Sequence, residues 1–241
     1  MLTINHVTKH YKGSNKGISD ISLTIQPGDI YAFIGHNGAG KTTMLKCVAG
    51  IHNMDMGEIL IDGINIQKDP LLCKQKIAYI PDNPDLYEYL TGIQYLSFIA
   101  DIFKVTKLER EQRIHKYAAD FEITESLGDL ISTYSHGMKQ KLAIISALVH
   151  QPKLLILDEP FVGLDPKASV LLKNIMHKIC DEGGAIFFST HVLDVAEKLC
   201  NKVAIIKDGI LVASGNMETI VKPGQSLESI FMEVITDDIT D

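Results

Sequence analysis

The chain has 241 residues, of which 46% are hydrophobic and 22% are charged, and its formal net charge is −7. This length and composition fit one large globular domain, or a core with an inserted subdomain, and exclude a disordered chain. The acidic balance argues against a domain that binds nucleic acid by neutralising phosphates, so no nucleic-acid partner is expected.

Membrane and redox signals are absent from the sequence. No apolar run approaches the roughly 18 residues that a membrane-spanning helix requires, and the N-terminus lacks a secretory signal. We therefore expect a cytoplasmic protein. The four cysteines have neither a C-x-x-C pair nor zinc-ligand spacing, which favours reduced structural thiols: Cys47, Cys73, Cys180 and Cys200.

In chain order, residues 2–12 and 18–26 carry short alternating apolar runs, and a turn at residues 13–17 predicts an antiparallel hairpin between them. The apolar run at residues 30–34 predicts a strand. A helix then begins at Lys41 and ends before Gly50, as a C-terminal glycine predicts.

The loop between that strand and that helix fits the pattern G-x-x-x-x-G-K-[ST]. It reads Gly35, His36, Asn37, Gly38, Ala39, Gly40, Lys41, Thr42, Thr43. The glycines allow backbone N–H groups to converge on an anion, Lys41 would reach the β- and γ-phosphates, and the Thr42 hydroxyl would bind Mg²⁺. A plain glycine-rich turn is the alternative. The strand, the three glycines, Lys41 and Thr42 all stand at the positions of the pattern, which favours a nucleoside triphosphate site.

Beyond the loop, strands are expected at residues 58–61 and 77–80 with a connecting loop between them, and helical periodicity extends over residues 83–149. Strands at 154–157 and 185–188 then alternate with helices at 166–180 and 192–199. A hairpin at 203–207 and 210–214, helices at 217–221 and 227–235, and an acidic tail follow. This alternation predicts a parallel sheet covered on both faces.

A second candidate stretch ends the buried strand at residues 154–157. Asp158 would hold Mg²⁺ through water at the strand tip, and Glu159 would polarise the water that attacks the γ-phosphate. An acidic turn without a catalytic role is the alternative interpretation. The phosphate loop upstream favours the catalytic one.

Together these motifs resemble the ATP-binding cassette ATPases, over residues 2–232. The family's signature commonly reads Leu-Ser-Gly-Gly-Gln; here Ser135 and Gly137 match, whereas Tyr134, His136 and Met138 depart from it. The form Ser-x-Gly-Met-Lys-Gln resembles a variant of exporter-type cassettes. The resemblance implies that residues 135–138 contact the γ-phosphate of ATP held by a partner subunit. A simple helix cap is the alternative for Ser135.

The same resemblance implies further roles. Tyr11 would stack on adenine, Asp165 would couple the two ATP sites of a dimer, and His191 would contact the γ-phosphate. Asp82 stands where the family has glutamine, so it would bind the metal through water or cap a loop. The side chains of His36 and His136 are interpreted as structural or exposed. In the aromatic segment at 84–98, Leu86 and Tyr87 are expected to face a membrane subunit, with the other aromatics in the core.

The predicted fold is α/β: a P-loop ATPase core with a mixed, largely parallel sheet, an N-terminal antiparallel β subdomain and an inserted helical subdomain. The cassette would span residues 1–222, with a core at 1–82 and 150–222 and the helical subdomain at 83–149. Residues 223–241 would form a C-terminal helix and the acidic tail.

The resemblance implies an ATP-hydrolysing subunit of a membrane exporter. Its cofactors would be ATP and Mg²⁺, and its partners a second cassette ATPase, identical or related, and a transmembrane permease. It would lie peripherally on the inner face of the cell membrane. An importer subunit, a soluble cassette ATPase that acts on ribosomes or DNA, and a regulatory module that binds ATP without hydrolysis are the alternatives.

Overall fold

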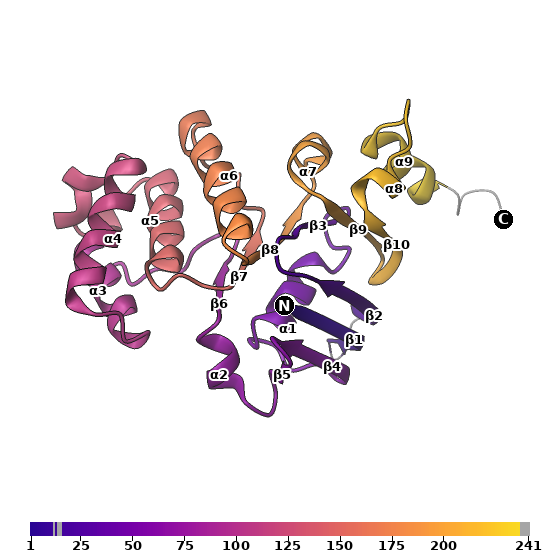
Figure 1. Cartoon of the computed structure of the whole chain (residues 1–241), viewed down its shortest axis with the longest axis horizontal. Helices are drawn as coiled ribbons and strands as arrows, with labels where there is room; N and C mark the ends of the chain where they lie inside the picture. Colours follow the sequence, from indigo (N-terminus) through magenta and orange to yellow (C-terminus); the bar gives the residue numbers. More distant parts are fainter. Residues whose placement is uncertain (12, 14–15, 237–241) are drawn as a thin grey trace.

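The structure is a computed structural model that describes residues 1–11, 13 and 16–236. Residues 14–15 of the predicted N-terminal turn and residues 237–241 of the predicted acidic tail therefore lie outside the described residues. Figure 1 shows the helical part of the chain at one end and the C-terminal helices at the other, with strands between them.

A small antiparallel sheet opens the chain. The strands β1 (Leu2–His10) and β2 (Gly17–Ile25) form the predicted hairpin, and β4 (Met56–Ile61) and β5 (Ile64–Asn65) complete the order β2-β1-β4-β5. In β1 Leu2 and Ile4 alternate at a spacing of two and are buried in one core, and an irregularity at His6, with φ of +50°, brings Val7 into the same core.

A six-stranded sheet forms the centre of the molecule, in the order β10-β9-β3-β8-β7-β6. Its strands are β3 (Ile30–Ile34), β6 (Ile77–Ile80), β7 (Leu154–Asp158), β8 (Ala185–Thr190), β9 (Lys202–Lys207) and β10 (Ile210–Asn216). All neighbours are parallel except β9 and β10. The prediction of a mixed, largely parallel sheet is confirmed.

The two faces of this sheet have separate cores. Tyr31 and Phe33 of β3 pack with α1 (Lys41–Val48) and the small sheet, whereas Ile30, Ala32 and Ile34 pack on the other face. That face is covered by α6 (Pro166–Asp181) and α7 (Leu193–Leu199), as Figure 1 shows. Since both faces are covered, β3, β7 and β8 are apolar over most of their length rather than alternating.

Helices occupy most of the segment predicted to be helical: α3 (Gly92–Ile102), α4 (Lys107–Asp120), two 3₁₀ turns (Thr124–Gly128 and Ile131–Thr133) and α5 (His136–Val149). Capping boxes at Thr91 and Thr106 begin α3 and α4. The apolar side chains of α5 belong to the same core as one face of the main sheet. The domain boundaries at 82 and 150 stay a prediction.

The connection expected to be a loop between residues 61 and 77 contains β5 and the short helix α2 (Pro70–Lys74), so that expectation was wrong. Pro70 occupies the first position of α2, where proline favours a helix. Leu71 and Leu72 are exposed and only Cys73 is buried, so no helical apolar stripe marks it in the sequence. At the C-terminus, α8 (Met217–Ile220) and α9 (Leu227–Thr236) follow the main sheet.

Asp29 offers a test of how the sheet is held together. It is buried, and its carboxylate accepts hydrogen bonds from Lys202 Nζ at 2.8 Å and Asn201 Nδ2 at 3.0 Å, which joins the start of β3 to the start of β9. Asp29→Ala leaves both donors unpaired and should lower the free energy of unfolding by roughly 2 to 3 kcal/mol. Urea denaturation would measure this. Glu111→Ala, at an exposed pair on α4, is the control and should cost less than about 0.5 kcal/mol.

Candidate active site

The phosphate loop joins β3 to α1 at the carboxyl edge of the main sheet. Two of its glycines have no room for a side chain: a Cβ on Gly35 would lie 2.5 Å from the Ile206 carbonyl oxygen, and one on Gly40 would lie 2.7 Å from Ile18 Cγ2. Gly40 also has φ of +108°, which side chains disfavour. The loop thus packs closely against both β2 of the small sheet and β9.

Lys41 carries the first charge of the site. Its side chain is only 7% exposed, and its ammonium group donates to the carbonyl oxygens of Gly35 at 2.8 Å and His36 at 3.2 Å. Glu159 Oε1 lies 3.7 Å away. Burial lowers the pKa of Lys41, against the attraction of Glu159 and Asp158. A positive charge is therefore held close to the cavity with little water around it.

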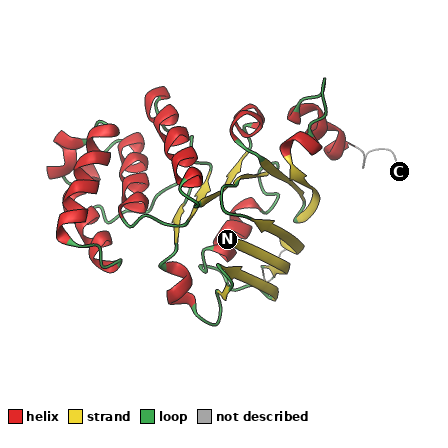
Figure 2. Cartoon of the chain, viewed as in Figure 1, coloured by secondary structure: helices red, strands yellow, loops and turns green. Residues whose placement is uncertain are grey.

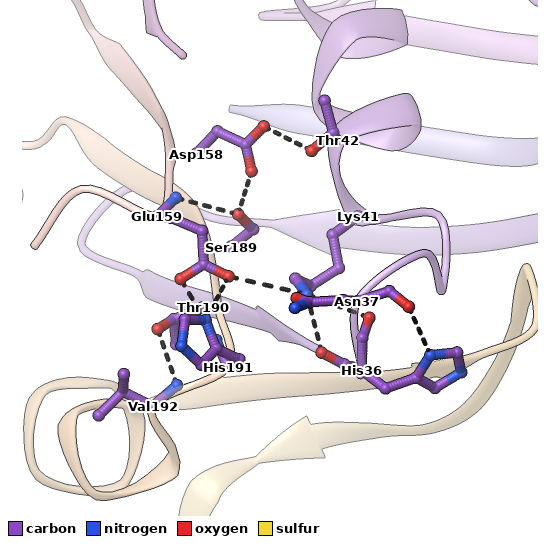
Figure 3. A network of polar contacts seen from close by, with 11 residues as sticks. His36, Asn37, Lys41, Thr42, Asp158, Glu159, Ser189, Thr190, His191 and Val192 are labelled. Atoms are coloured by element: carbon purple, nitrogen blue, oxygen red, sulfur yellow. Dashed lines mark hydrogen bonds and ion pairs between the residues drawn. The ribbon is translucent and has the colours of Figure 1, made fainter. Parts of the chain in front are cut away.

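Asp158, at the tip of β7, faces the beginning of α1. The Thr42 hydroxyl donates to Asp158 Oδ2 at 2.6 Å, and Ser189 of β8 donates to the other carboxylate oxygen (Figure 3). Burial raises the pKa of Asp158 despite these two donors, and the neighbouring carboxylates of Asp82 and Glu159 add to the rise. The carboxylate thus lies in an environment that favours a nearby cation.

Glu159 takes a left-handed backbone conformation, with φ of +48°, which is uncommon for a residue with a side chain. Its N–H donates to the Ser189 hydroxyl at 3.2 Å. Its carboxylate is 14% exposed, and Oε1 lies 3.0 Å from Nδ1 of the half-exposed His191 (Figure 3). The strained turn directs this carboxylate between Lys41 and His191.

Lys41, Thr42, Asp158 and Glu159 share one cavity of about 340 Å³, whereas His191 contacts Glu159 but is not among the described residues that line the cavity. Tyr11, Asp82, Asp158 and Glu159 line it together with residues of the phosphate loop. The Tyr11 hydroxyl lies 3.2 Å from Thr43 Oγ1, and its ring contacts His52 edge to face. Asp82 also accepts a hydrogen bond from the Asn83 N–H at 2.9 Å, so it caps its own loop while facing the cavity.

The cavity has the chemistry that a magnesium nucleotide requires. Converging backbone N–H groups and the Lys41 ammonium suit phosphate oxygens, and the Thr42 hydroxyl and the Asp158 carboxylate are the hard oxygen ligands that Mg²⁺ prefers. Tyr11, which also lines the cavity, is 38% exposed and offers an aromatic ring. The residues present fit both ATP and Mg²⁺.

The signature residues lie apart from this cavity. Ser135 caps α5, accepting a hydrogen bond from the Met138 N–H at 3.3 Å, which is the alternative that its sequence left open. Ser135 and His136 are exposed, and Gly137 and Met138 are half-buried. Among the described residues, none of these four lines the cavity beside Lys41. One chain therefore has the phosphate-loop cavity at one place and the N-terminus of α5, with the signature residues, at another.

The loop after Glu159 contacts that helix N-terminus. A Cβ on Gly163 would lie 2.6 Å from the His136 ring, so ring and loop are in close contact. Asp165 caps α6 through the Ala168 N–H at 2.8 Å and pairs with Lys141 Nζ of α5 at 2.6 Å. The hydrogen bond from Lys141 holds the pKa of Asp165 below its usual value. Asp165, at the end of the loop from Glu159 to α6, thus attaches this loop to α5.

The expectation for the aromatic segment was partly wrong. Leu86, expected at the surface, is buried in the core that α3 and α5 share with the sheet. Tyr87 is exposed as expected, but Tyr89 and Phe98, assigned to the core, are exposed as well. The rings of Tyr89, Tyr95 and Phe98 all contact Tyr87. The exposed patch is therefore larger and more aromatic than predicted.

Comparisons with known proteins agree with this geometry. A family model described as "ABC transporter" matches residues 18–162. YhcH of Bacillus subtilis (strain 168), described as an ABC transporter ATP-binding protein, is 36% identical over 90% of this chain and 70% of its own length. SkfE of the same organism, described as the SkfA peptide export ATP-binding protein, is 35% identical over 88% of this chain and 87% of its own.

A solved structure described as an ATP binding subunit of an ABC transporter has a TM-score of 0.93 and 32% identity, and the match covers 98% of this chain and 99% of that one. Fold and site thus define a P-loop ATPase that binds ATP. The chain belongs to the ABC transporter family and is an ATP-binding subunit. None of its described helices has the length and hydropathy needed to cross a bilayer.

The raised pKa of Asp158 gives a test of the site's charge balance. The native state holds this proton more tightly than the unfolded chain, so the stabilisation by that proton is complete below the ordinary pKa of 3.8 and is lost as the pH rises through the folded pKa. Asp158→Asn does not ionise. Its free energy of unfolding, relative to that of the unsubstituted chain, should therefore increase with pH from about 4 upwards. Urea denaturation in EDTA would measure this, and a constant difference would contradict it.

Proposed function

We propose that this ATPase powers export through a separate transmembrane permease, using ATP and Mg²⁺ bound in the cavity beside Lys41. The observation that carries the proposal is the convergence of Lys41, Asp158 and Glu159 on one cavity, from two segments that are distant in the sequence. The direction of transport is supported by the signature variant and by the printed name of SkfE, a peptide export protein.

In this proposal the loop N–H groups and Lys41 hold the β- and γ-phosphates, and Tyr11 stacks on adenine. Thr42 and Asp158 hold Mg²⁺, with Asp82 contributing through water; when bound, the metal neutralises phosphate charge. Glu159 takes a proton from the water whose oxygen attacks the γ-phosphorus, and ADP leaves with the bridging oxygen. His191, 3.0 Å from Glu159, orients that carboxylate and contacts the γ-phosphate.

A second cassette subunit would complete the site. The N-terminus of the 14-residue helix α5 is a ready site for an anion, because its N–H groups and its dipole favour negative charge. Ser135, His136, Gly137 and Met138 of one subunit would cover the γ-phosphate held by the other. Asp165, anchored to both α6 and α5, would couple the two sites across the dimer.

The permease would dock in an apolar cleft of about 330 Å³ between the main sheet and the helical segment. Ile51, Ile99 and the stacked rings of Phe103 and His150 line it. Tyr79 also lines the cleft, whose largely apolar lining suits the apolar face of a helix from the permease. Docking here would place the chain on the cytoplasmic face of the membrane.

Glu159→Gln tests the hydrolytic role. Glutamine keeps the size of the side chain but cannot take the proton, so turnover of ATP should fall by about 10²- to 10⁴-fold while the Kd for ATP stays nearly unchanged. Phosphate release and calorimetry would measure the two quantities. Glu182→Gln, an exposed change at the end of α6, is the matched control. Unchanged turnover in Glu159→Gln would remove Glu159 from the mechanism.

Ile51→Asp tests the docking cleft, since Ile51 is 53% exposed at its edge and lies outside the nucleotide cavity. Co-purification of a polytopic membrane protein with the tagged chain, from mild detergent with ATP and Mg²⁺, should fall roughly ten-fold or more. ATP turnover by the isolated variant should stay within about two-fold. Leu72→Asp, at a leucine of α2 that is 51% exposed, is the control. Equal losses in both variants would contradict docking at this cleft.

A further inference from the structure

The turn between β9 and β10 touches the outer side of the phosphate loop. Asp208 and Gly209 form this turn, with φ of +47° and +81°, as a two-residue hairpin of the Asp-Gly type requires. The Gly209 N–H donates to the Ala39 carbonyl at 2.9 Å, and the Gly209 carbonyl accepts from the Ser19 N–H at 2.8 Å. The turn is therefore fixed between the loop and β2.

Close packing makes this contact rigid. A Cβ on Gly209 would lie 2.6 Å from the Gly17 carbonyl oxygen, and one on Gly40 would lie 2.9 Å from the same atom. Backbone thus meets backbone at Gly17 from two sides. A shift of the turn would be transmitted to the phosphate loop through these backbone contacts and through the hydrogen bond from the Gly209 N–H to the Ala39 carbonyl.

A polar link adds to this contact. His36 Nδ1 lies 2.9 Å from the Asn37 carbonyl oxygen, as Figure 3 shows, and Nε2 lies 3.4 Å from Asp208 Oδ1. The carbonyl only accepts, so Nδ1 is the donor of that hydrogen bond. The opposite nitrogen, Nε2, faces the Asp208 carboxylate at a distance that allows an ion pair. His36 therefore bridges the loop backbone and the turn.

The bridged carbonyl belongs to the peptide that links Asn37 to Gly38. A trans peptide directs its N–H opposite its C=O. Gly38 lines the nucleotide cavity, whereas the His36 side chain is 42% exposed and is not among the described residues that line it. Holding the Asn37 carbonyl on the outer side therefore leaves the Gly38 N–H directed to the inner side, where a phosphate oxygen would accept it.

We propose that His36 and Asp208 are positioning residues of the phosphate loop, which hold the Asn37 carbonyl outward so that the Gly38 N–H is pre-oriented for phosphate. This rests on the proposed binding of ATP beside Lys41. Neither residue touches the reacting atoms, so their substitution should change the affinity for ATP and leave the chemical step unaffected. The sequence pattern offers no sign of this role, because Asp208 is 171 residues from Asn37 in the chain.

Four full-length variants test the proposal by calorimetric titration with ATP and Mg²⁺ and by steady-state turnover. His36→Ala should raise the Kd for ATP roughly three- to ten-fold through the lost hydrogen bond, with kcat within about two-fold. Asp208→Asn keeps a residue that tolerates the left-handed backbone and removes only the charge, so its effect should be roughly two- to five-fold. The double variant should bind no more weakly than His36→Ala alone.

His36→Asn is the rescue variant, because its amide can donate to the Asn37 carbonyl but cannot reach Asp208. It should bind ATP about as tightly as Asp208→Asn does, and more tightly than His36→Ala. Asp20→Asn is the matched control: Asp20 pairs with His6 at 2.7 Å in a similar exposed pair away from the cavity, and this change should leave the Kd unaltered. Additive effects of His36→Ala and Asp208→Asn would overturn the proposal.

A measurement without nucleotide separates this proposal from the binding of ATP itself. Amide hydrogen exchange over residues 35–40 should be faster in His36→Ala and Asp208→Asn than in the unsubstituted chain and in Asp20→Asn. Unchanged exchange in both would overturn the positioning role. Failure of the unsubstituted chain to bind ATP would instead overturn the proposed function.

Discussion

The charge of Lys41 is the feature on which the rest of the site depends. An ammonium ion that is almost buried is costly unless oxygen atoms surround it, and here two loop carbonyls and the Glu159 carboxylate do so. The lowered pKa of Lys41 indicates that this compensation is incomplete. Phosphate oxygens would complete the compensation of this charge. The buried ammonium group of the free protein therefore favours the binding of a nucleotide.

The sheet order brings the compensating groups together. Because β8 lies between β3 and β7, its Ser189 reaches both acidic residues at the tip of β7: its hydroxyl donates to Asp158 and accepts from the Glu159 N–H. His191 leaves the same strand and meets Glu159. The carboxyl edge of a parallel sheet thus gathers a lysine, two carboxylates and an imidazole from three separate segments, as open α/β sheets do at their ligand sites.

Local patterns predicted much of this arrangement. The glycine spacing before Lys41 predicted the loop, and two carboxylates at the end of a buried apolar run predicted Asp158 and Glu159 at a strand tip. What the sequence did not predict depends on contacts between distant segments. Ser189 received no role because the strand order was unknown, Leu86 was assigned to the surface because its burial depends on how α3 and α5 meet the sheet, and the short helix α2 has too few apolar positions to show a period.

Thermal unfolding of the full chain with and without saturating ATP and Mg²⁺ tests most directly whether Lys41 is the phosphate-binding charge of this ATPase. A ligand that binds only the native state, at about one hundred times its Kd, should add about 2.7 kcal/mol to the free energy of unfolding. Lys41→Met should be folded and should lose nearly all of this gain. An equal gain in Lys41→Met and in the unsubstituted chain would show that the nucleotide binds elsewhere and would contradict the account.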